Sequence, residues 1–178
     1  MFSAPKKTAD GRYYAKPTDR VMMQVNNVGI SGKFSESDTV TLEIADCTKI
    51  SDVDTKVIQA AKENSELWFG KVLPDKTLEA AYTSSVVNCA MNVDKVIHKG
   101  ECICRTFAAD KTFMDPELIE DGAICDVYIE FAGLYFMKKT YSPVWKLVQV
   151  KLRPGNKKKY TDECMFQDDD VEESDEEL

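Results

Sequence analysis

Alternating apolar and polar positions predict that most of this chain is β-structure. In residues 124–136 the odd positions from Cys125 to Phe131 are apolar, and the even positions from Asp126 to Glu130 are polar or aromatic. A period of two is typical of a strand with one buried face. This segment and residues 145–153 flank a short turn-like stretch, so we expect them to form a hairpin, which is the clearest structural unit in the sequence.

The second strand of this hairpin predicts which side chains face solvent. Its latter half alternates between the apolar Val148, Val150 and Leu152 and the polar Gln149, Lys151 and Arg153. By extrapolation Trp145 has the parity of the polar set. We therefore expect Trp145 to be partly exposed beside an amide and two cations, and the three aliphatic residues to lie in the core.

The remaining pattern places helices between strands. Strands are expected at residues 21–30, 39–45, 86–93 and 101–107, a helix at 51–65 with Ser51 and Asp54 in capping-box spacing, a second helix at 75–84, and a helical turn at 115–120. No β-α-β alternation is present. This order favours a small β-barrel or sandwich with helical insertions. Residues 1–20 are polar, basic and aromatic, and are expected to be a flexible N-terminal arm.

Charge is distributed unevenly along the chain. The net charge is −8, from 31 acids and 23 Lys or Arg residues. Eight of the acids lie beyond Gln167, where there is no base, so the rest of the chain is balanced at 23 of each. Between Glu130 and Asp162 there are eight cations and no acid. A basic hairpin with aromatic residues suits the phosphates and bases of a nucleic-acid strand.

Other compositional features narrow the class of protein. No apolar run is long enough for a membrane helix, and the N-terminus lacks a signal-peptide core, so we expect an intracellular protein with reduced cysteines and no membrane partner. Cys102 and Cys104 with His98 do not have a zinc spacing, and we expect core thiols and no metal or other cofactor. Phosphate-binding and hydrolase motifs are absent, which favours a non-enzymatic protein.

The hairpin resembles that of a known family. Gly133, Leu134, Tyr135 and Phe136, followed by Trp145-Lys146-Leu147-Val148-Gln149, are similar to the last hairpin of the single-stranded-DNA-binding proteins of large nucleocytoplasmic DNA viruses, which are related to the single-strand binders of T7-like phages. The acidic C-terminus is a second similarity, although it ends in Leu178 where the phage proteins end in an aromatic residue. The resemblance implies an OB-fold barrel with an inserted helix, a tail that recruits replication partners, and a viral location, either the host nucleus or a cytoplasmic virus factory.

These observations define the predicted organisation. We expect an OB-fold domain at residues 21–154, a linker at 155–166 and a disordered acidic tail at 167–178. The predicted nucleic-acid-binding residues are Trp145, Lys138, Lys139, Tyr141, Lys146, Gln149, Lys151, Arg153, Tyr135, Arg105 and Phe107. The predicted partner-binding residues of the tail are Asp168, Asp169, Asp170, Glu172, Glu173, Asp175, Glu176, Glu177 and Leu178.

The predicted function is sequence-independent binding of single-stranded DNA in replication, recombination or repair. The tail would regulate that binding and recruit a polymerase or other replication protein. RNA as the bound strand and a homodimeric state stay open. The alternative is a protein-interaction module, similar to a histone chaperone, whose acidic tail binds basic partners.

Overall fold

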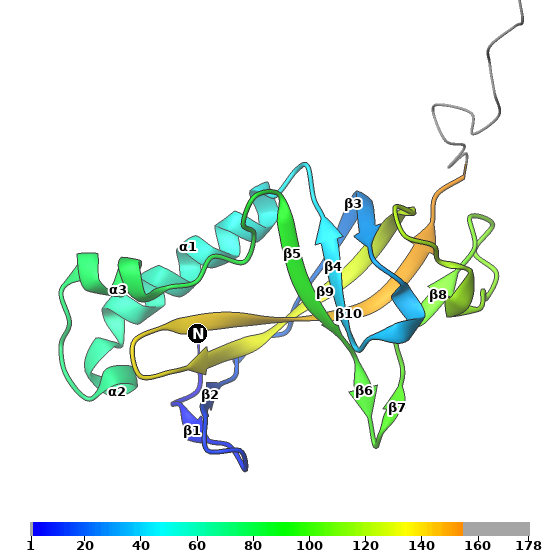
Figure 1. The fold of residues 1–178 in the computed structure, drawn as a ribbon. Helices are drawn as coiled ribbons and strands as arrows, with labels where there is room; N and C mark the ends of the chain where they lie inside the picture. The colour runs from blue at the N-terminus through cyan, green and yellow to red at the C-terminus, as the bar shows by residue number, and fades with distance from the viewer. Residues whose placement is uncertain (1, 155–178) are drawn as a thin grey trace, which may run out of the picture.

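The computed structural model describes residues 2–154, and it shows a mainly β protein with helices at one end (Figure 1). The predicted linker at 155–166 and the predicted acidic tail at 167–178 lie outside the described residues. The sheet contains two long strands, β9 (Ile124–Phe136) and β10 (Tyr141–Leu152), which form the hairpin predicted from the alternation. This hairpin runs the whole length of the molecule and connects its two ends.

Five strands close into a barrel. They are β3 (Val21–Ser31), β4 (Thr39–Glu43), β5 (Ala90–Lys95), β9 and β10. The strands pair in the order β9-β3-β4-β5-β10, and β10 pairs back to β9. The β5–β10 pair is parallel, whereas the other four pairs are antiparallel. A closed five-stranded Greek-key barrel of this order is an OB-fold, so the predicted fold class is confirmed.

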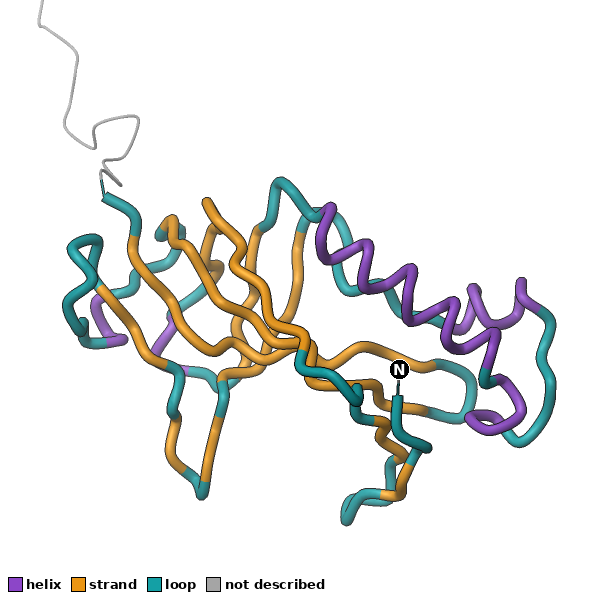
Figure 2. Tube along the Cα trace, turned by 180° about the vertical axis from the view of Figure 1, so that it is seen from behind, coloured by secondary structure: helices purple, strands orange, loops and turns teal. Residues whose placement is uncertain are grey.

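Two small hairpins project from the barrel. The first pairs β1 (Lys6–Lys7) with β2 (Tyr13–Ala15), and the second pairs β6 (Ile97–His98) with β7 (Glu101–Cys102). In Figures 1 and 2 both point to the same side of the long hairpin. Because β2 pairs with the end of β9, residues 2–20 are not the loose arm expected from their polarity. The strand expected at residues 101–107 is divided into β7 and β8 (Arg105–Phe107), and β8 runs parallel to β10.

Three helices lie between β4 and β5 and cover the far end of the long hairpin (Figure 1). They are α1 (Thr48–Glu63), α2 (Ser65–Phe69) and α3 (Asp75–Ala81), and two 3-10 turns lie at Phe34–Glu36 (η1) and Pro116–Leu118 (η2). The helix α1 begins at Thr48, so Ser51 is not its cap. Asp54 instead accepts hydrogen bonds from the Tyr82 hydroxyl at 2.6 Å and the Ser85 amide at 2.9 Å, which ties the helix to the segment before β5.

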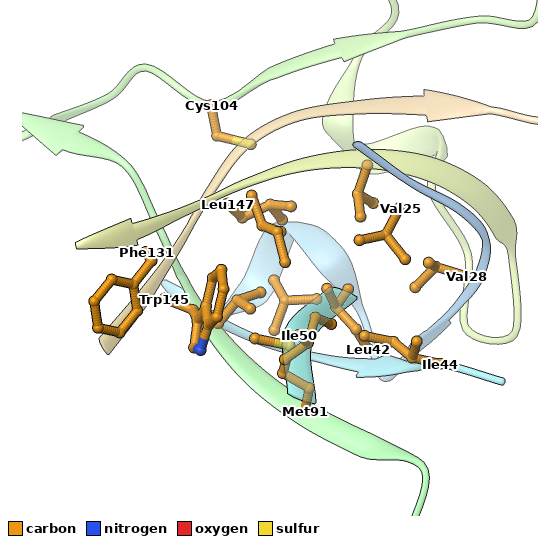
Figure 3. Close-up of a cluster of buried hydrophobic side chains, with 14 of the residues drawn as sticks. Val25, Val28, Leu42, Ile44, Ile50, Met91, Cys104, Phe131, Trp145 and Leu147 are labelled. Atoms are coloured by element: carbon orange, nitrogen blue, oxygen red, sulfur yellow. The ribbon is translucent and has the colours of Figure 1, made fainter. Parts of the chain in front are cut away.

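The barrel interior explains why Trp145 is not on the surface. Figure 3 shows its ring inside the barrel beside Phe131 and near Met91, and only 3% of the residue is exposed. The register between β9 and β10 shifts twice: Ala132 is an extra residue of β9 opposite the step from Val144 to Trp145, and Val148 is an extra residue of β10 between Leu147 and Gln149. Each β-bulge changes which side chains face inward. Trp145 and Leu147 are therefore core residues, Val150 is buried as predicted, and Val148 and Leu152 are half-buried.

Among residues 2–154, no helix is both long enough and apolar enough to cross a membrane.

Candidate nucleic-acid interface

A shallow groove crosses the outer surface of β3, β9, β10 and β8, and we call it the aromatic groove. Tyr128 of β9 lies opposite Gln24 of β3 on one side and Gln149 of β10 on the other. Gln149 in turn lies opposite Arg105 of β8. Directly opposed residues point to the same face of a sheet, so these side chains share one surface. The groove has a volume of about 240 Å³ and is lined by Gln24, Phe107, Lys111, Asp126, Val127, Tyr128, Gln149, Val150 and Lys151.

Aromatic rings are exposed in and beside this groove. Tyr128 is 41% exposed, and Phe113, in the loop that follows β8, is 78% exposed. The Phe113 ring stacks on Phe107, with ring centroids 5.1 Å apart and an interplanar angle of 28°. Exposed flat rings in a groove are unusual in a monomeric surface, since they leave apolar area in water, and they are suited to stacking against a planar ligand.

The electrostatics of the groove favour an anion. Asp126 is the one carboxylate among the groove-lining residues, and it lies 2.8 Å from Arg153 and 3.6 Å from Lys151. Burial would raise the pKa of Asp126, but the amide of Asn27 and these two cations outweigh burial and lower it. Asp126 therefore stays charged, and the three groups together carry one positive charge. Arg105 and Lys111 are exposed and form no ion pair within residues 2–154.

Some of the predicted binding residues meet at this groove. Gln149, Lys151 and Phe107 line it. Arg105 and Arg153 lie at its margin, because Arg105 is opposite Gln149 in the sheet and Arg153 forms an ion pair with Asp126. These residues come from β8 and β10, which are separated by more than 30 residues of chain. Only the parallel pairing of the two strands brings them together.

Trp145 and Tyr141, two of the predicted stacking residues, are buried, so the prediction that they are exposed was wrong. The Trp145 indole donates a hydrogen bond from Nε1 to Ser85 Oγ at 2.8 Å. Tyr141 is fully buried under the helices and donates its hydroxyl to the carbonyl of Leu78 at 3.0 Å. Burial, and to a smaller extent the charge of Glu79, raises the pKa of Tyr141 to about 12. Both rings stabilise the core and are not available for bases.

The other predicted residues lie away from the aromatic groove. Lys138 and Lys139 are exposed in the turn of the long hairpin, at the opposite end from Gln149. Lys146 is half-buried, opposite Glu130, with its Nζ 3.8 Å from Asp94. Tyr135 is half-buried against the Tyr14 ring, with centroids 5.0 Å apart. The predicted set is thus distributed along β9 and β10 and does not form one cluster.

Sequence reasoning missed Tyr128, Phe113, Lys111 and Gln24. Tyr128 had a signal, because it shares the polar parity of Asp126 and Glu130 in an otherwise clean alternation. An aromatic residue on the solvent face of a strand is a candidate for stacking. Phe113 and Lys111 lie in the irregular segment after β8, where no periodicity exists to report their direction.

The usual ligand face of an OB-fold is less suitable here. That face is formed by the second and third barrel strands with the loops next to them, and in this chain it is the outer side of β4 and β5. Its outward side chains are Thr39, Thr41, Glu43, Asn92 and Asp94, which include two carboxylates and no cation. Lys95 of β5 is buried and donates to the carbonyl of Phe34. The face is therefore poorly suited to phosphates.

Cys102, Cys104 and His98 do not form a ligand cluster. Cys104 is buried, and burial raises the pKa of its thiol to about 12. Cys102 is exposed because the strand is interrupted between β7 and β8, so the expectation that both thiols lie in the core was wrong for Cys102. Within residues 2–154, no three His, Cys, Asp or Glu side chains are placed to hold a metal ion.

Comparisons with known proteins give a family and a set of similar folds. The model of a family described as "Family of unknown function (DUF5871)" matches residues 26–168. No curated protein matches the sequence. Among solved structures, the single-stranded DNA-binding protein from bacteriophage Enc34 in complex with ssDNA is 16% identical, with a TM-score of 0.47, covering 84% of this chain and 94% of that chain.

The same phage protein also matches in two other structures. A C-terminal truncation is 15% identical with a TM-score of 0.49, covering 86% of this chain and 95% of that chain. The third structure is also 15% identical with a TM-score of 0.49, and it covers 86% of this chain and 89% of that one. These identities are too low to transfer a binding partner to this chain.

Proposed function

The chain belongs to DUF5871, a family of unknown function, and from its aromatic groove we propose that it is a non-enzymatic, sequence-independent single-stranded-DNA-binding protein. The observation that carries this proposal is the position of exposed rings among cations on the outside of an OB-fold barrel. Tyr128 and the stacked Phe107–Phe113 pair provide flat faces, and Lys111, Lys151 and Arg105 provide charge for phosphates.

The chemistry of the groove favours a single strand over a duplex. Stacking of a base on an aromatic side chain contributes about 1–3 kcal/mol and tolerates any base, since every base has a π-face. A duplex keeps its base faces covered, so it cannot use Tyr128 or Phe113. Gln24 and Gln149 could hydrogen-bond base edges or sugars, but two amides give little discrimination between sequences.

The size of the groove argues against a small-molecule site. Dedicated ligand pockets enclose roughly 300–1,000 Å³ and cover most of their ligand. A groove of about 240 Å³ whose rings are open to solvent suits one segment of a longer polymer.

We also propose the role that the acidic C-terminus has in this function. The residues after Gln167 carry eight acids and no base, so they resemble a strand of phosphates in charge and would compete for the cations of the groove. They would also dock on a polymerase or another replication protein, which places the protein in replication, recombination or repair. Removing the residues after Phe166 is then expected to tighten DNA binding at low salt, and unchanged affinity would refute the competition.

Fluorescence anisotropy with labelled oligo-dT tests the main proposal. A labelled oligonucleotide is needed because Trp68 and Trp145 are both buried and are poor reporters of surface binding. We expect Tyr128→Ala and Phe113→Ala each to weaken binding about 5- to 150-fold, the equivalent of one lost stacking contact. Leu67→Ala is the matched control, because Leu67 is an exposed apolar residue on α2, away from the groove.

Three results would contradict the proposal. The first is no saturable binding of oligo-dT at low salt, with or without the residues after Phe166. The second is equal or tighter binding of duplex DNA. The third is loss of affinity in Thr41→Ala or Asn92→Ala with none in Tyr128→Ala, which would move the site to the outer side of β4 and β5. Oligo-rU of the same length, measured in parallel, shows whether the 2′-hydroxyl is tolerated.

A further inference from the structure

The N-terminal hairpin is the second basic and aromatic surface of the molecule. Residues 2–20 contain five cations and two carboxylates. One carboxylate, Asp10, is paired with Arg12 at 2.5 Å. Lys6 lies opposite Tyr14 across the β1–β2 pair, and Tyr14 lies opposite Tyr135 of β9, so a cation and two half-buried rings share the outer face of the sheet. This is the same combination of groups that defines the aromatic groove.

The hairpin is held firmly on β9. The Tyr14 hydroxyl donates to the carbonyl of Ala132, and the Arg12 guanidinium lies 4.2 Å from the centre of the Tyr135 ring. Tyr14 crosses the strand over Gly133, whose φ of +150° is unusual for any other residue. A Cβ at Gly133 would lie 2.6 Å from Tyr14 Cζ, so the absence of a side chain there is what allows the hairpin to dock.

The outer face of β9 connects the hairpin to the groove. Its outward residues from the groove to the hairpin are Asp126, Tyr128, Glu130 and Tyr135. At about 3.3 Å per residue, Tyr128 and Tyr135 are roughly 23 Å apart along the strand. Between them lies one carboxylate, Glu130, which pairs at 2.8 Å with Arg20 from the segment that follows the hairpin. The outer face of β9 between the groove and the hairpin therefore carries no unpaired negative charge.

The direction of the hairpin agrees with such a route. In Figures 1 and 2 the β1–β2 hairpin and the β6–β7 hairpin project to the same side of the long β9–β10 hairpin. Because β2 pairs with the end of β9, the N-terminal hairpin lies at one end of the outer face of that strand. A long strand on this face would meet the N-terminal hairpin as a side wall.

We propose that the β1–β2 hairpin is a second nucleic-acid-binding element, which holds a strand that has filled the aromatic groove and continues along β9 past Glu130. The proposal rests on the proposed function, since it extends the same strand. Lys6 contacts the continuing strand, together with the exposed Lys16, which lines a hollow with Arg20 and Glu130. Arg20 neutralises Glu130, and Arg12 and Tyr14 position the hairpin. Short oligonucleotides reach only the groove, whereas longer ones reach both surfaces.

Oligonucleotide length separates the two elements. The full-length protein is titrated with labelled oligo-dT of about 6 and about 20 nucleotides, within and beyond the reach of one OB-fold surface. Lys6→Ala/Lys16→Ala is expected to weaken binding of the long oligonucleotide about 10-fold and to leave the short one unchanged. Loss of two phosphate contacts also makes the log–log salt slope for the long oligonucleotide shallower by about 1.4.

The matched control removes equal charge elsewhere. Lys56→Ala/Lys76→Ala deletes two exposed lysines from α1 and α3 and is expected to change neither affinity. Equal thermal unfolding of the variants and the wild type shows that the fold is retained.

The outcomes are distinguishable. If the wild type binds both lengths and the hairpin variant matches it on the long one, the second element is refuted and the groove stands. If the hairpin variant loses both lengths equally, the hairpin belongs to the primary site and the inference is again refuted. If the wild type binds neither length, the proposed function itself fails.

Discussion

Gly133→Ala is the sharpest test of how the N-terminal hairpin is attached. The new methyl group would overlap the carbonyl oxygen of Ala15 and lie 2.6 Å from Tyr14 Cζ, both of which belong to β2. The backbone would also be held at φ +150°, which for a residue with a side chain costs about 1–3 kcal/mol. Neither the overlap with a backbone atom nor the dihedral strain is relieved by rotating a side chain.

The expected result is release of the hairpin. Moving β2 away breaks its pairing with β9, the hydrogen bond from Tyr14 to Ala132 and the stacking of Arg12 on Tyr135. We expect the melting temperature to fall by about 2–12 °C, since 1 kcal/mol corresponds to roughly 2–4 °C for a chain of this size. Trypsin should cleave faster after Arg12 and Lys16 than in the wild type.

Gly122→Ala is the control for this experiment. Gly122 also has a positive φ, of +81°, but a Cβ there meets nothing within 4 Å. Gly122→Ala should therefore lower the melting temperature through backbone strain alone, without faster trypsin cleavage in residues 6–16. If Gly133→Ala leaves both cleavage and melting unchanged, the close approach of Tyr14 to β9 does not exist in solution and the reasoning is refuted.

Two further predictions concern the core and the charge of the groove. Trp145→Phe removes the hydrogen bond to Ser85 and part of the ring, so the free energy of unfolding in urea should fall by about 1–3 kcal/mol. The folded variant should bind oligo-dT as the wild type does. A fivefold loss of affinity would show that Trp145 belongs to the binding site. Asp126 has a lowered pKa in the fold, so its stabilisation is complete above its unfolded value of about 4 and is lost as the pH falls through the lower folded value. Asp126→Asn should therefore make the urea midpoint less dependent on pH below about 4, and an unchanged pH dependence would contradict the assignment.

The order of elements was predictable because local patterns report it directly. The alternation in residues 124–136 predicted β9 with its buried face, and β3, β4, α1 and α3 were also found close to their predicted positions. The distribution of charge along the chain showed that the last hairpin is basic. These features depend on side chains within one element, so sequence alone can reveal them.

The individual site residues were less predictable, because their direction depends on pairing. The bulge at Val148 reverses the alternation of β10, so that Trp145 and Leu147 face inward while Gln149 faces outward, and no feature of the sequence announces a bulge there. The stacked Phe107–Phe113 pair depends on a loop without periodicity. The N-terminal hairpin looks like a disordered arm in composition, and it is ordered because β9 offers it an unpaired edge and a glycine.

The sequence by itself determined the mainly β architecture, the position of the helices and the basic character of the last hairpin. Only the tertiary structure decided which face of that hairpin is open. The reason is geometric: a strand has two faces, a shift of one residue exchanges them, and the shift is set by partners far away in the chain. Tyr128, Gln149 and Arg105 share a surface because β9, β10 and β8 pair in a particular register, and the pairing is a property of the closed barrel.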